Sequence, residues 1–525
     1  MHSREIADNG LTLLKKGKQG MVHALFGRGG LLILCMLVQA VILFGAFFWF
    51  EDNLFIYLGG SALFTVCITL YLVNSSMDPT AKVTWLVIIM ILPVFGCIFY
   101  LWTQSEFGRR TLKALVNRSG KLSENLIRQQ PEPMEKLAAE DPGAAGLARY
   151  IASCGQFPVY QNTDVTYFPQ GEDKWKRMLQ ELETAQHFIY LEYFIVNEGL
   201  MWGKILEILA RKARQGVDVK MMYDGTCELT TLPYDYPRRL NALGIQCKMF
   251  SPISPVISTH YNYRDHRKIL VIDGSTAFTG GVNLADEYIN HVNRFGHWKD
   301  TAIMLKGAAV ESFTLMFLQM WNVDEREPKF PQTVPVPEIP AKTEGFVIPY
   351  ADCPLDDNKI GEMVYIDLLN RATQYAHIMT PYLILDGEME TALKFAAQRG
   401  VEVKIILPGI PDKKIPYALA KTHYRSLLRS GVQIYEYTPG FVHAKVFSVD
   451  GKEAVVGTIN LDYRSLYHHF ECAAYLREVR CLPDIEKDFH KTLLKCRTVS
   501  EETVKKEKPL VKVTGVLAKI IAPLL

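Results

Sequence analysis

The N-terminal part of the chain contains three apolar stretches without a charged side chain. They cover residues 31–50, 54–73 and 84–102, and each is close to the ~20 residues that an α-helix needs to cross a bilayer. Aromatic residues such as Trp49, Tyr71 and Trp102 lie toward their ends, as they do at membrane interfaces. The pattern predicts a membrane anchor over residues 1–105, followed by a charged, helix-prone connector over 106–155.

Basic residues flank both ends of this apolar region. Lys15, Lys16 and Lys18 precede the first stretch, and Arg109 and Arg110 follow the last. Three full spans would separate the two basic clusters, whereas basic residues favour the cytoplasmic side. One stretch is therefore expected to be re-entrant or interfacial, which leaves two to three transmembrane helices. The expected location is the cell membrane, multi-pass, with a catalytic part that faces the cytoplasm.

Beyond residue 156 the apolar runs become short, and one pattern occurs twice. The first copy, residues 266–283, reads HRKILVIDGSTAFTGGVN, and the second, residues 443–460, reads HAKVFSVDGKEAVVGTIN. Each has a β-branched run that ends in Asp-Gly and a second apolar run that ends in a glycine segment and Asn. This pattern predicts a buried hairpin. Alternation along its first strand places the histidine and the lysine of the motif on one face.

The segments before the hairpins repeat as well. Gly216 and Gly400 each separate a helical segment from a strand, and Gly244 and Gly431 each precede a further short strand. This self-similarity predicts a duplicated α/β unit. The predicted domains are residues 156–327 and 343–500, joined by a Pro-rich linker over 328–342 and followed by a basic amphipathic tail over 501–525.

The tail allows two interpretations. Its apolar residues at 510, 513, 517, 520, 521 and 524 form a helical stripe, and Lys505, Lys506 and Lys508 precede it. Such a helix either lies on the surface of a membrane that contains anionic lipids or packs on the protein as a terminal helix.

Charge and cysteine content exclude other classes of function. The 58 basic and 56 acidic residues give a net charge of only +2, so nothing indicates a nucleic-acid partner. The ten cysteines form no CxxC pair and no metal-ligand spacing with histidine, which predicts unpaired thiols. No metal and no cofactor is expected, and the sequence does not indicate an oligomeric state.

The repeated motif supplies the groups that phosphodiester chemistry needs. One histidine can attack phosphorus and form a phosphohistidine, while the other protonates the departing oxygen and later deprotonates the incoming alcohol. Lysines provide fixed positive charge, and neighbouring motif residues provide neutral contacts. The predicted catalytic set is His266, Lys268, Asp273, His443, Lys445 and Asp450. The predicted substrate-binding residues are Asn283, Asn460, Gly281 and Thr458.

A nucleophilic imidazole is usually held in one tautomer by a carboxylate on its other nitrogen. Asp300 and Glu471 follow the two motifs at similar distances and are the candidates for this role. Asp273 and Asp450 belong to the motif itself, but we expect them to support the site structurally. The near symmetry of the two motifs does not decide which histidine attacks.

The two His-x-Lys-x4-Asp motifs, each followed by Gly-Gly/Thr-x-Asn, resemble those of the phospholipase D superfamily. Within it, the segment 457–465 and the membrane-anchored layout resemble bacterial cardiolipin synthases, over nearly the whole chain. One position departs from the pattern, because the family often has Asn where this chain has His469.

The resemblance implies an α/β fold in which N-terminal transmembrane helices precede two tandem phospholipase D-like α/β/α sandwich domains that share one active site. It implies His266 as nucleophile and His443 as acid and base, with Asp300 and Glu471 orienting the histidines. The implied reaction joins two phosphatidylglycerol molecules into cardiolipin and releases glycerol. The alternative is a phospholipase D-type hydrolase, or a transferase that uses another alcohol or phospholipid. A nuclease and an inactive membrane scaffold fit less well.

Several further polar residues have a structural interpretation. His291, His297, His468 and His469 are expected to be ordinary structural histidines. Glu192, the only charged residue in the apolar run 190–195, either lines the site or is satisfied by an arginine or by the backbone at a strand edge.

Overall fold

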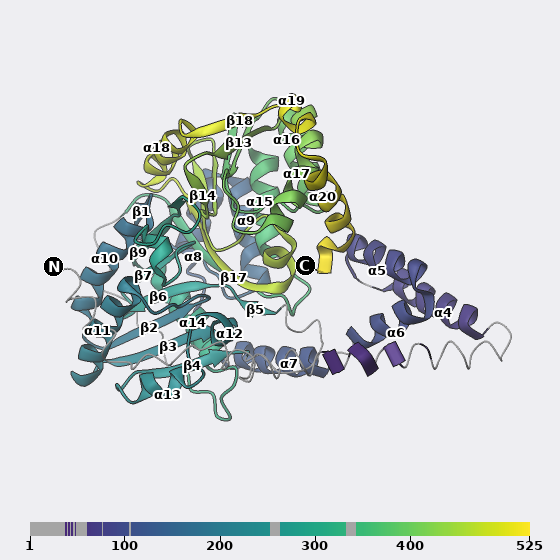
Figure 1. Cartoon of the computed structure of the whole chain (residues 1–525). Helices are drawn as coiled ribbons and strands as arrows, with labels where there is room; N and C mark the ends of the chain where they lie inside the picture. The colour runs from purple at the N-terminus through teal and green to yellow at the C-terminus, as the bar shows by residue number, and fades with distance from the viewer. Residues whose placement is uncertain are drawn as a thin grey trace.

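The computed structural model describes residues 60–75, 77–103, 107–251, 263–331 and 343–524, together with scattered positions between residues 37 and 48. Two α/β units form the body of the molecule, and a group of apolar helices projects from it (Figure 1). Most of the apolar stretch predicted at 31–50 and most of the Pro-rich linker lie outside the described residues.

The projecting helices are α4 (Gly60–Asn74), α5 (Pro79–Ile91) and α6 (Pro93–Thr103). The stretch predicted as one helix over 84–102 is therefore two helices. The break falls at Pro93, which has no N–H to donate and whose ring clashes with the carbonyl one turn earlier. α5 and α6 pack on each other, with the rings of Trp85 and Tyr100 5.2 Å apart. Within the described ranges, no helix combines the length and apolar character needed to cross a bilayer.

The predicted connector consists of three helices, α7 (Phe107–Leu122), α8 (Pro131–Glu140) and α9 (Pro142–Cys154). Pro131 begins a helix rather than breaking one, because a proline at the first helical position leaves no hydrogen bond unmade. Leu147 and Ile151 of α9 are buried in the core of the second unit. This helix therefore precedes the first unit in the sequence but packs on the second unit in the structure.

The first unit contains a seven-stranded sheet in the order β1-β9-β7-β6-β2-β3-β4. Its strands are β1 (Thr163–Phe168), β2 (Phe188–Tyr193), β3 (Asp218–Asp224), β4 (Gln246–Phe250), β6 (Lys268–Ile272), β7 (Thr276–Gly280) and β9 (Ala302–Gly307). The longer helices are α10 (Gly171–Thr184), α11 (Leu200–Arg214) and α14 (Val310–Trp321); α12 (Thr226–Thr230) and α13 (Tyr236–Asn241) are short. α10 and α11 pack on one face of the sheet through a shared apolar core.

The second unit repeats this arrangement in the order β10-β17-β16-β15-β11-β12-β13-β18. Its strands are β10 (Phe346–Asp352), β11 (Tyr375–Met379), β12 (Glu402–Pro408), β13 (Gln433–Tyr437), β15 (Val446–Val449), β16 (Glu453–Gly457), β17 (His469–Arg477) and β18 (Cys496–Val499). Its main helices are α15 (Ile360–Arg371), α16 (Gly387–Gln398), α17 (Lys414–Arg429) and α18 (Leu482–Leu493).

The duplication predicted from the sequence is confirmed at the level of strands and turns. In each unit a parallel strand pair lies beside the motif hairpin: β2 and β3 beside β6, and β11 and β12 beside β15. Gly216 and Gly400 follow equivalent helices with φ near +93° and +94°, a conformation that favours glycine because a side chain would clash.

The two sheets share a core. One apolar cluster combines residues of the first sheet, such as Val271 and Ile303, with residues of the second, such as Val446 and Ala474. The sheets therefore lie in the middle of the molecule, and α10 and α11 on one side and α15 to α17 on the other form the outer layers (Figure 1). The described cysteines are free thiols, as the sequence predicts.

The C-terminal tail forms α19 (Glu501–Lys505) and α20 (Pro509–Ile521). α20 packs on α17 through Gly515, where an added Cβ would lie 2.4 Å from the carbonyl oxygen of Ala418. It also contacts the projecting helices, because the Thr84 hydroxyl of α5 donates to the Ile520 carbonyl at 2.7 Å (Figure 1). Its other side is apolar and exposed, including Leu510 and Leu517. The tail helix therefore combines packing on the protein with an uncovered apolar face.

Candidate active site

Each motif forms the hairpin that its sequence predicts. β6 pairs antiparallel with β7, and β15 with β16. The turns between them are Asp273-Gly274 and Asp450-Gly451, and all four residues have φ between 51° and 66°. Two consecutive positive φ values define the type I′ turn, for which Asp-Gly is a preferred sequence.

The motif aspartates hold these turns. Asp273 accepts hydrogen bonds from the backbone N–H groups of residues 186–188 at 2.7–2.8 Å, and Asp450 does the same for residues 373–375. The whole of β6 separates Asp273 from Lys268, roughly 16 Å at about 3.3 Å per residue. The catalytic set predicted from the sequence includes both aspartates, but they lie apart from the histidines and lysines, and the contacts described for them hold the turns.

Two short strands cross between the units and lead into the motif histidines. β5 (Arg264–Asp265) precedes His266 and pairs in parallel with the start of β17 in the second unit. β14 (Gly440–Val442) precedes His443 and pairs in parallel with β8 (His297–Lys299) in the first unit. The backbone N–H groups of the two histidines continue these ladders, donating to the carbonyls of residues 470 and 299.

This exchange places each histidine beside the acid of the other unit. Nδ1 of His266 lies 2.9 and 3.0 Å from the two carboxylate oxygens of Glu471. Nδ1 of His443 lies 2.7 Å from Oδ2 of Asp300. All four side chains are buried. Each carboxylate accepts the Nδ1 proton, which leaves Nε2 as the reactive nitrogen.

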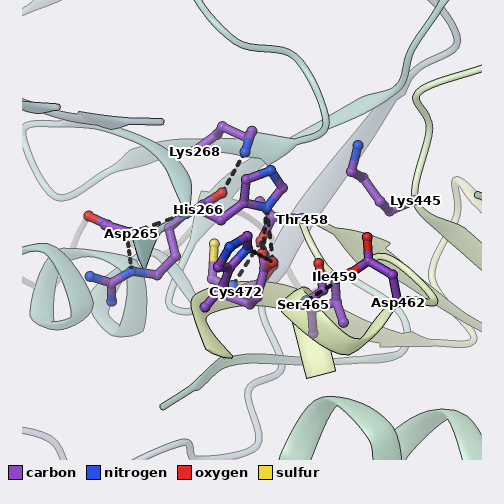
Figure 2. Close-up of polar contacts among 12 residues, drawn as sticks. Asp265, His266, Lys268, Lys445, Thr458, Ile459, Asp462, Ser465 and Cys472 are labelled. Atoms are coloured by element: carbon purple, nitrogen blue, oxygen red, sulfur yellow. Dashed lines mark hydrogen bonds and ion pairs between the residues drawn. The ribbon is translucent and has the colours of Figure 1, made fainter. Parts of the chain in front are cut away.

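The motif lysines lie next to their own histidines. Lys268 and Lys445 each donate to the backbone carbonyl of the histidine two residues earlier. Lys445 Nζ also lies 3.0 Å from both ring nitrogens of His443. In Figure 2 the His266 ring lies between the two lysine side chains. A phosphate bound next to the His266 ring would contact the ammonium groups of both lysines, one from each unit.

Gly281 and Thr458 occupy equivalent positions after the second strand of each hairpin, and both contact an orienting acid. A Cβ at Gly281 would lie 2.0 Å from Oδ1 of Asp300 and 2.8 Å from the His443 carbonyl oxygen. The Thr458 hydroxyl donates to Glu471 (Figure 2). These residues, predicted to bind substrate, therefore lie against the carboxylates that hold the histidines.

The two motif asparagines differ in their contacts. Asn283 accepts a hydrogen bond from the Ile195 N–H at 3.0 Å and donates to the Tyr288 hydroxyl at 2.8 Å. The Tyr288 ring in turn packs edge-on against His443. Asn460 is buried, and its Oδ1 has no hydrogen-bond partner within the described ranges of the chain. Asn283 thus positions the aromatic ring that packs against His443. The carbonyl oxygen of Asn460 remains available to accept a hydrogen bond.

The sequence did not predict the aromatic rings that pack against the motif histidines, nor one further histidine beside them. Phe194 lies edge-on to His266, with ring centroids 4.8 Å apart, and Trp298 lies 5.4 Å from His443. His469, expected to be an ordinary structural histidine, lies 5.3 Å from His266, ring to ring. Its position two residues before Glu471 was the available signal, since alternate strand residues share a face.

The remaining polar candidates are structural. Glu192 forms a buried ion pair with Arg267, which is the second of its two interpretations. His291 is exposed. His297 contacts the Tyr437 hydroxyl at 3.1 Å, and His468 lies 3.3 Å from the Pro523 carbonyl oxygen.

Burial sets the protonation of the site. Desolvation, together with Lys445, lowers the pKa of His443 to about 4, and desolvation lowers the pKa of His266 well below its usual value. Desolvation also lowers the pKa of Lys268 to about 8 and that of Lys445 to about 7. Burial opposes ionisation of Glu471, but His266 and His469 lower the pKa of its carboxyl below the ordinary value. At neutral pH the imidazoles are therefore neutral, and Glu471 is ionised.

These groups can carry out in-line displacement at phosphorus. Neutral His266 has a free Nε2 lone pair, and the lysines stabilise charge on the non-bridging oxygens. A bound anionic phosphodiester raises the pKa of the neighbouring His443, because opposite charge favours the imidazolium form. A histidine protonated in this way could then serve as a general acid.

Known proteins resemble the chain over most of its length. The family described as cardiolipin synthase, PLD-like domain, matches residues 178–321 and 365–493, and a phospholipase D-nuclease N-terminal family matches residues 62–103. An uncharacterized protein of Streptococcus mutans is 55% identical and covers 87% of this chain and 99% of its own. A cardiolipin synthase of Geobacillus kaustophilus is 31% identical, with 94% and 98% covered.

A solved structure supports the same fold. The phosphatidylserine synthase of Haemophilus influenzae superposes with a TM-score of 0.53 at 15% sequence identity, covering 70% of this chain and 97% of its own. Both halves match one family, and a relative aligns with the chain over nearly its whole length. These matches show the family of the chain. The protein belongs to the phospholipase D-like cardiolipin synthase family.

Proposed function

We propose that this protein is a cardiolipin synthase that transfers a phosphatidyl group from one phosphatidylglycerol to another. The observation that carries the proposal is the reciprocal arrangement of His266 with Glu471 and His443 with Asp300, with a lysine beside each histidine. It provides two imidazoles with fixed tautomers and a buried lysine beside each of them.

In the first step, His266 Nε2 attacks phosphorus of the donor lipid. The bond from phosphorus to the headgroup glycerol oxygen breaks, and His443 gives its proton to that oxygen, so that glycerol leaves. In the second step, the headgroup hydroxyl of another phosphatidylglycerol gives its proton to His443 and attacks phosphorus. The bond from phosphorus to Nε2 breaks, which yields cardiolipin and restores both histidines.

The surroundings of the rings favour His266 as the nucleophile. Nε2 of His266 has no hydrogen-bond partner in the described part of the chain, whereas Lys445 Nζ lies 3.0 Å from Nε2 of His443. Its equal distances of 3.0 Å to Nδ1 and Nε2 place the ammonium over the face of the His443 ring, where its positive charge disfavours attack of this ring on phosphorus. The family resemblance makes the same assignment.

We place the protein at the membrane, with α20 as one contact with the lipid. Three side chains of α20, Leu510, Val516 and Leu517, are 76%, 61% and 60% exposed. Lys505, Lys506 and Lys508 precede the helix, and α5 beside it exposes Met90 and Ile91. An uncovered apolar face with lysines at its start suits an interface rich in anionic phosphatidylglycerol.

The decisive experiment incubates the purified full-length protein with phosphatidylglycerol vesicles and quantifies cardiolipin, phosphatidic acid and free glycerol. Equal amounts of cardiolipin and glycerol are expected. Phosphatidic acid and glycerol without cardiolipin would identify a hydrolase instead. His266→Asn and His443→Asn are expected to abolish turnover, while His490→Asn, an exposed histidine outside the site, serves as the matched control.

A further inference from the structure

A group of potential metal ligands lies behind His266, on the side away from Nε2. Nδ1 of His266 is 2.9 Å from Oε1 of Glu471, and Nδ1 of His469 is 3.6 Å from the same oxygen. One donor atom from each residue lies within 4.8 Å of the other two. Two imidazole nitrogens and one carboxylate oxygen make up a donor set that proteins use for zinc.

His469 provides a second, independent observation. Its side chain is only 9% exposed, and among the residues that the structure describes Nδ1 has no partner within hydrogen-bond distance. A buried polar atom without a partner has a free-energy cost, because it has lost its water. The described residues thus leave a nitrogen without a partner 3.6 Å from a carboxylate, in the direction of His266.

We propose that His266, His469 and Glu471 bind one Zn²⁺ ion and that this ion inhibits the enzyme. Zinc bonds to nitrogen and oxygen are about 2.0–2.2 Å long, so tetrahedral ligands lie roughly 3.3 Å from one another. The separations of 2.9 and 3.6 Å lie on either side of this value. The two histidine nitrogens lie within 4.8 Å of each other, so the side chains must move closer together to complete the site.

The protonation of the ligands suits a metal ion. Metals bind neutral imidazole and ionised carboxylate, and ligands that carry protons must first lose them. The proton that zinc must displace is the one that His266 Nδ1 shares with Glu471, so the metal takes the place that this proton now occupies.

Inhibition follows from which nitrogen the metal occupies, and this consequence rests on the proposed function. A neutral imidazole that binds zinc through Nδ1 carries its proton on Nε2, which then has no lone pair with which to attack phosphorus. The metal also removes Glu471 as the acceptor that fixes the ring. The ion does not need to fill the substrate place to stop the reaction.

A second potential group, His377, Glu486 and His490, lies outside the active site. It is less suitable because Nδ1 of His377 is 2.6 Å from Glu486 and Nε2 is 3.3 Å from Glu402. Both ring nitrogens of His377 already have carboxylate partners. Its effect on zinc binding is nevertheless removed experimentally by using His490→Asn as the background.

The test titrates Zn²⁺ into chelator-treated, detergent-solubilised full-length protein by calorimetry. The His490→Asn protein is expected to bind one tight zinc ion. Adding His469→Asn, the residue that the family often has, is expected to weaken this binding by about 10-fold or more, since even outer partners of metal ligands contribute 10–100-fold. Equal tight binding by both proteins would place the ion elsewhere and overturn the proposal.

Activity on phosphatidylglycerol vesicles is then measured with increasing zinc. The His490→Asn protein is expected to lose activity as the site fills, and whatever activity His469→Asn retains is expected to resist zinc. Full activity with the site occupied would contradict inhibition. Since binding is measured by heat, a protein that binds zinc but makes no cardiolipin would separate failure of the proposed function from failure of the metal site.

Cobalt provides a check that needs no variant. Co²⁺ in a tetrahedral site absorbs visible light strongly, and geometry of this kind is diagnostic of the ligand set. Wild-type protein is expected to give this absorption and to lose it when zinc is added. If His469→Asn fails to fold, absence of the cobalt signal in the folded wild-type protein would still overturn the proposal.

Discussion

Glu471, in the second unit, accepts the Nδ1 proton of His266, in the first, at 2.9 and 3.0 Å. Asp300 and His443 make the reverse exchange at 2.7 Å. Neither unit therefore contains a complete histidine–carboxylate pair, and the single active site requires both.

Replacing Glu471 with Gln is expected to lower kcat by up to about 10⁴, the loss seen when the orienting aspartate of a catalytic triad becomes asparagine. The amide keeps the size of the side chain but no longer stabilises a positive imidazole. Cardiolipin formation on vesicles is the measurement, with circular dichroism to establish that the variant is folded. Asp300→Asn is expected to behave alike, and a loss below about threefold in both would contradict the orienting role.

Lys268→Ala and Lys445→Ala are each expected to lower the rate by about 10²–10³, as removal of one oxyanion contact typically does. Both lysines are buried beside the histidines. A cation from solvent therefore cannot easily take the place of the missing ammonium group. Single-turnover measurements separate this chemical effect from weaker lipid binding. Lys204→Ala, which removes a lysine on α11 paired with Glu207, is the control and is expected to keep normal activity.

The activity is expected to fall at alkaline pH. Burial lowers the pKa of Lys445 to about 7 and that of Lys268 to about 8, and only the protonated lysines stabilise the transition state. Their charge is present below these values and is lost as the pH rises through them, so kcat/KM, which reports the free enzyme, decreases there. Lys445→Arg remains charged and is expected to move the decrease to higher pH. An unchanged alkaline limb in this variant would assign the decrease to another group.

Gly281→Ala is expected to impair both activity and stability. The added Cβ would lie 2.0 Å from Asp300 Oδ1, so the carboxylate must move away from His443; forced overpacking typically costs about 1–3 kcal/mol. Gly146→Ala in α9 is the matched control, because its Cβ meets nothing within 4 Å and alanine favours a helix. Gly281→Ala is expected to lower both the Tm and the turnover. Gly146→Ala is expected to keep or slightly raise the Tm and to leave turnover unchanged. Equal Tm values would show that the site tolerates the methyl group.

Leu517→Glu on α20 is expected to reduce turnover on vesicles with a low fraction of phosphatidylglycerol, because a carboxylate is costly in the interface and is repelled by anionic lipid. Turnover of a short-chain, water-soluble phosphatidylglycerol should remain normal. Leu494→Glu changes a leucine at the end of α18 that is 88% exposed, against 60% for Leu517, and is the control. Equal effects of the two substitutions on vesicle activity would remove α20 from the lipid contact.

Local sequence determined much of this protein. The repeated hairpins, their Asp-Gly turns and the duplicated order of elements were predictable, because alternation and turn chemistry act over a few neighbouring residues. The break at Pro93 was equally readable from the sequence, yet the uniform apolar character of residues 84–102 led to the prediction of one helix. Composition alone does not override a proline.

Tertiary structure decided how the motifs are used. The sequence indicated Asp300 and Glu471 as the orienting acids. That each acid contacts the histidine of the other unit depends on the pairing of β5 with β17 and of β14 with β8. Those strands join residues 205 and 143 positions apart, and no local pattern encodes such a register. The same pairing brought His469 beside His266. The sequence thus determined which chemical groups the protein has, and long-range strand pairing determined which of them meet.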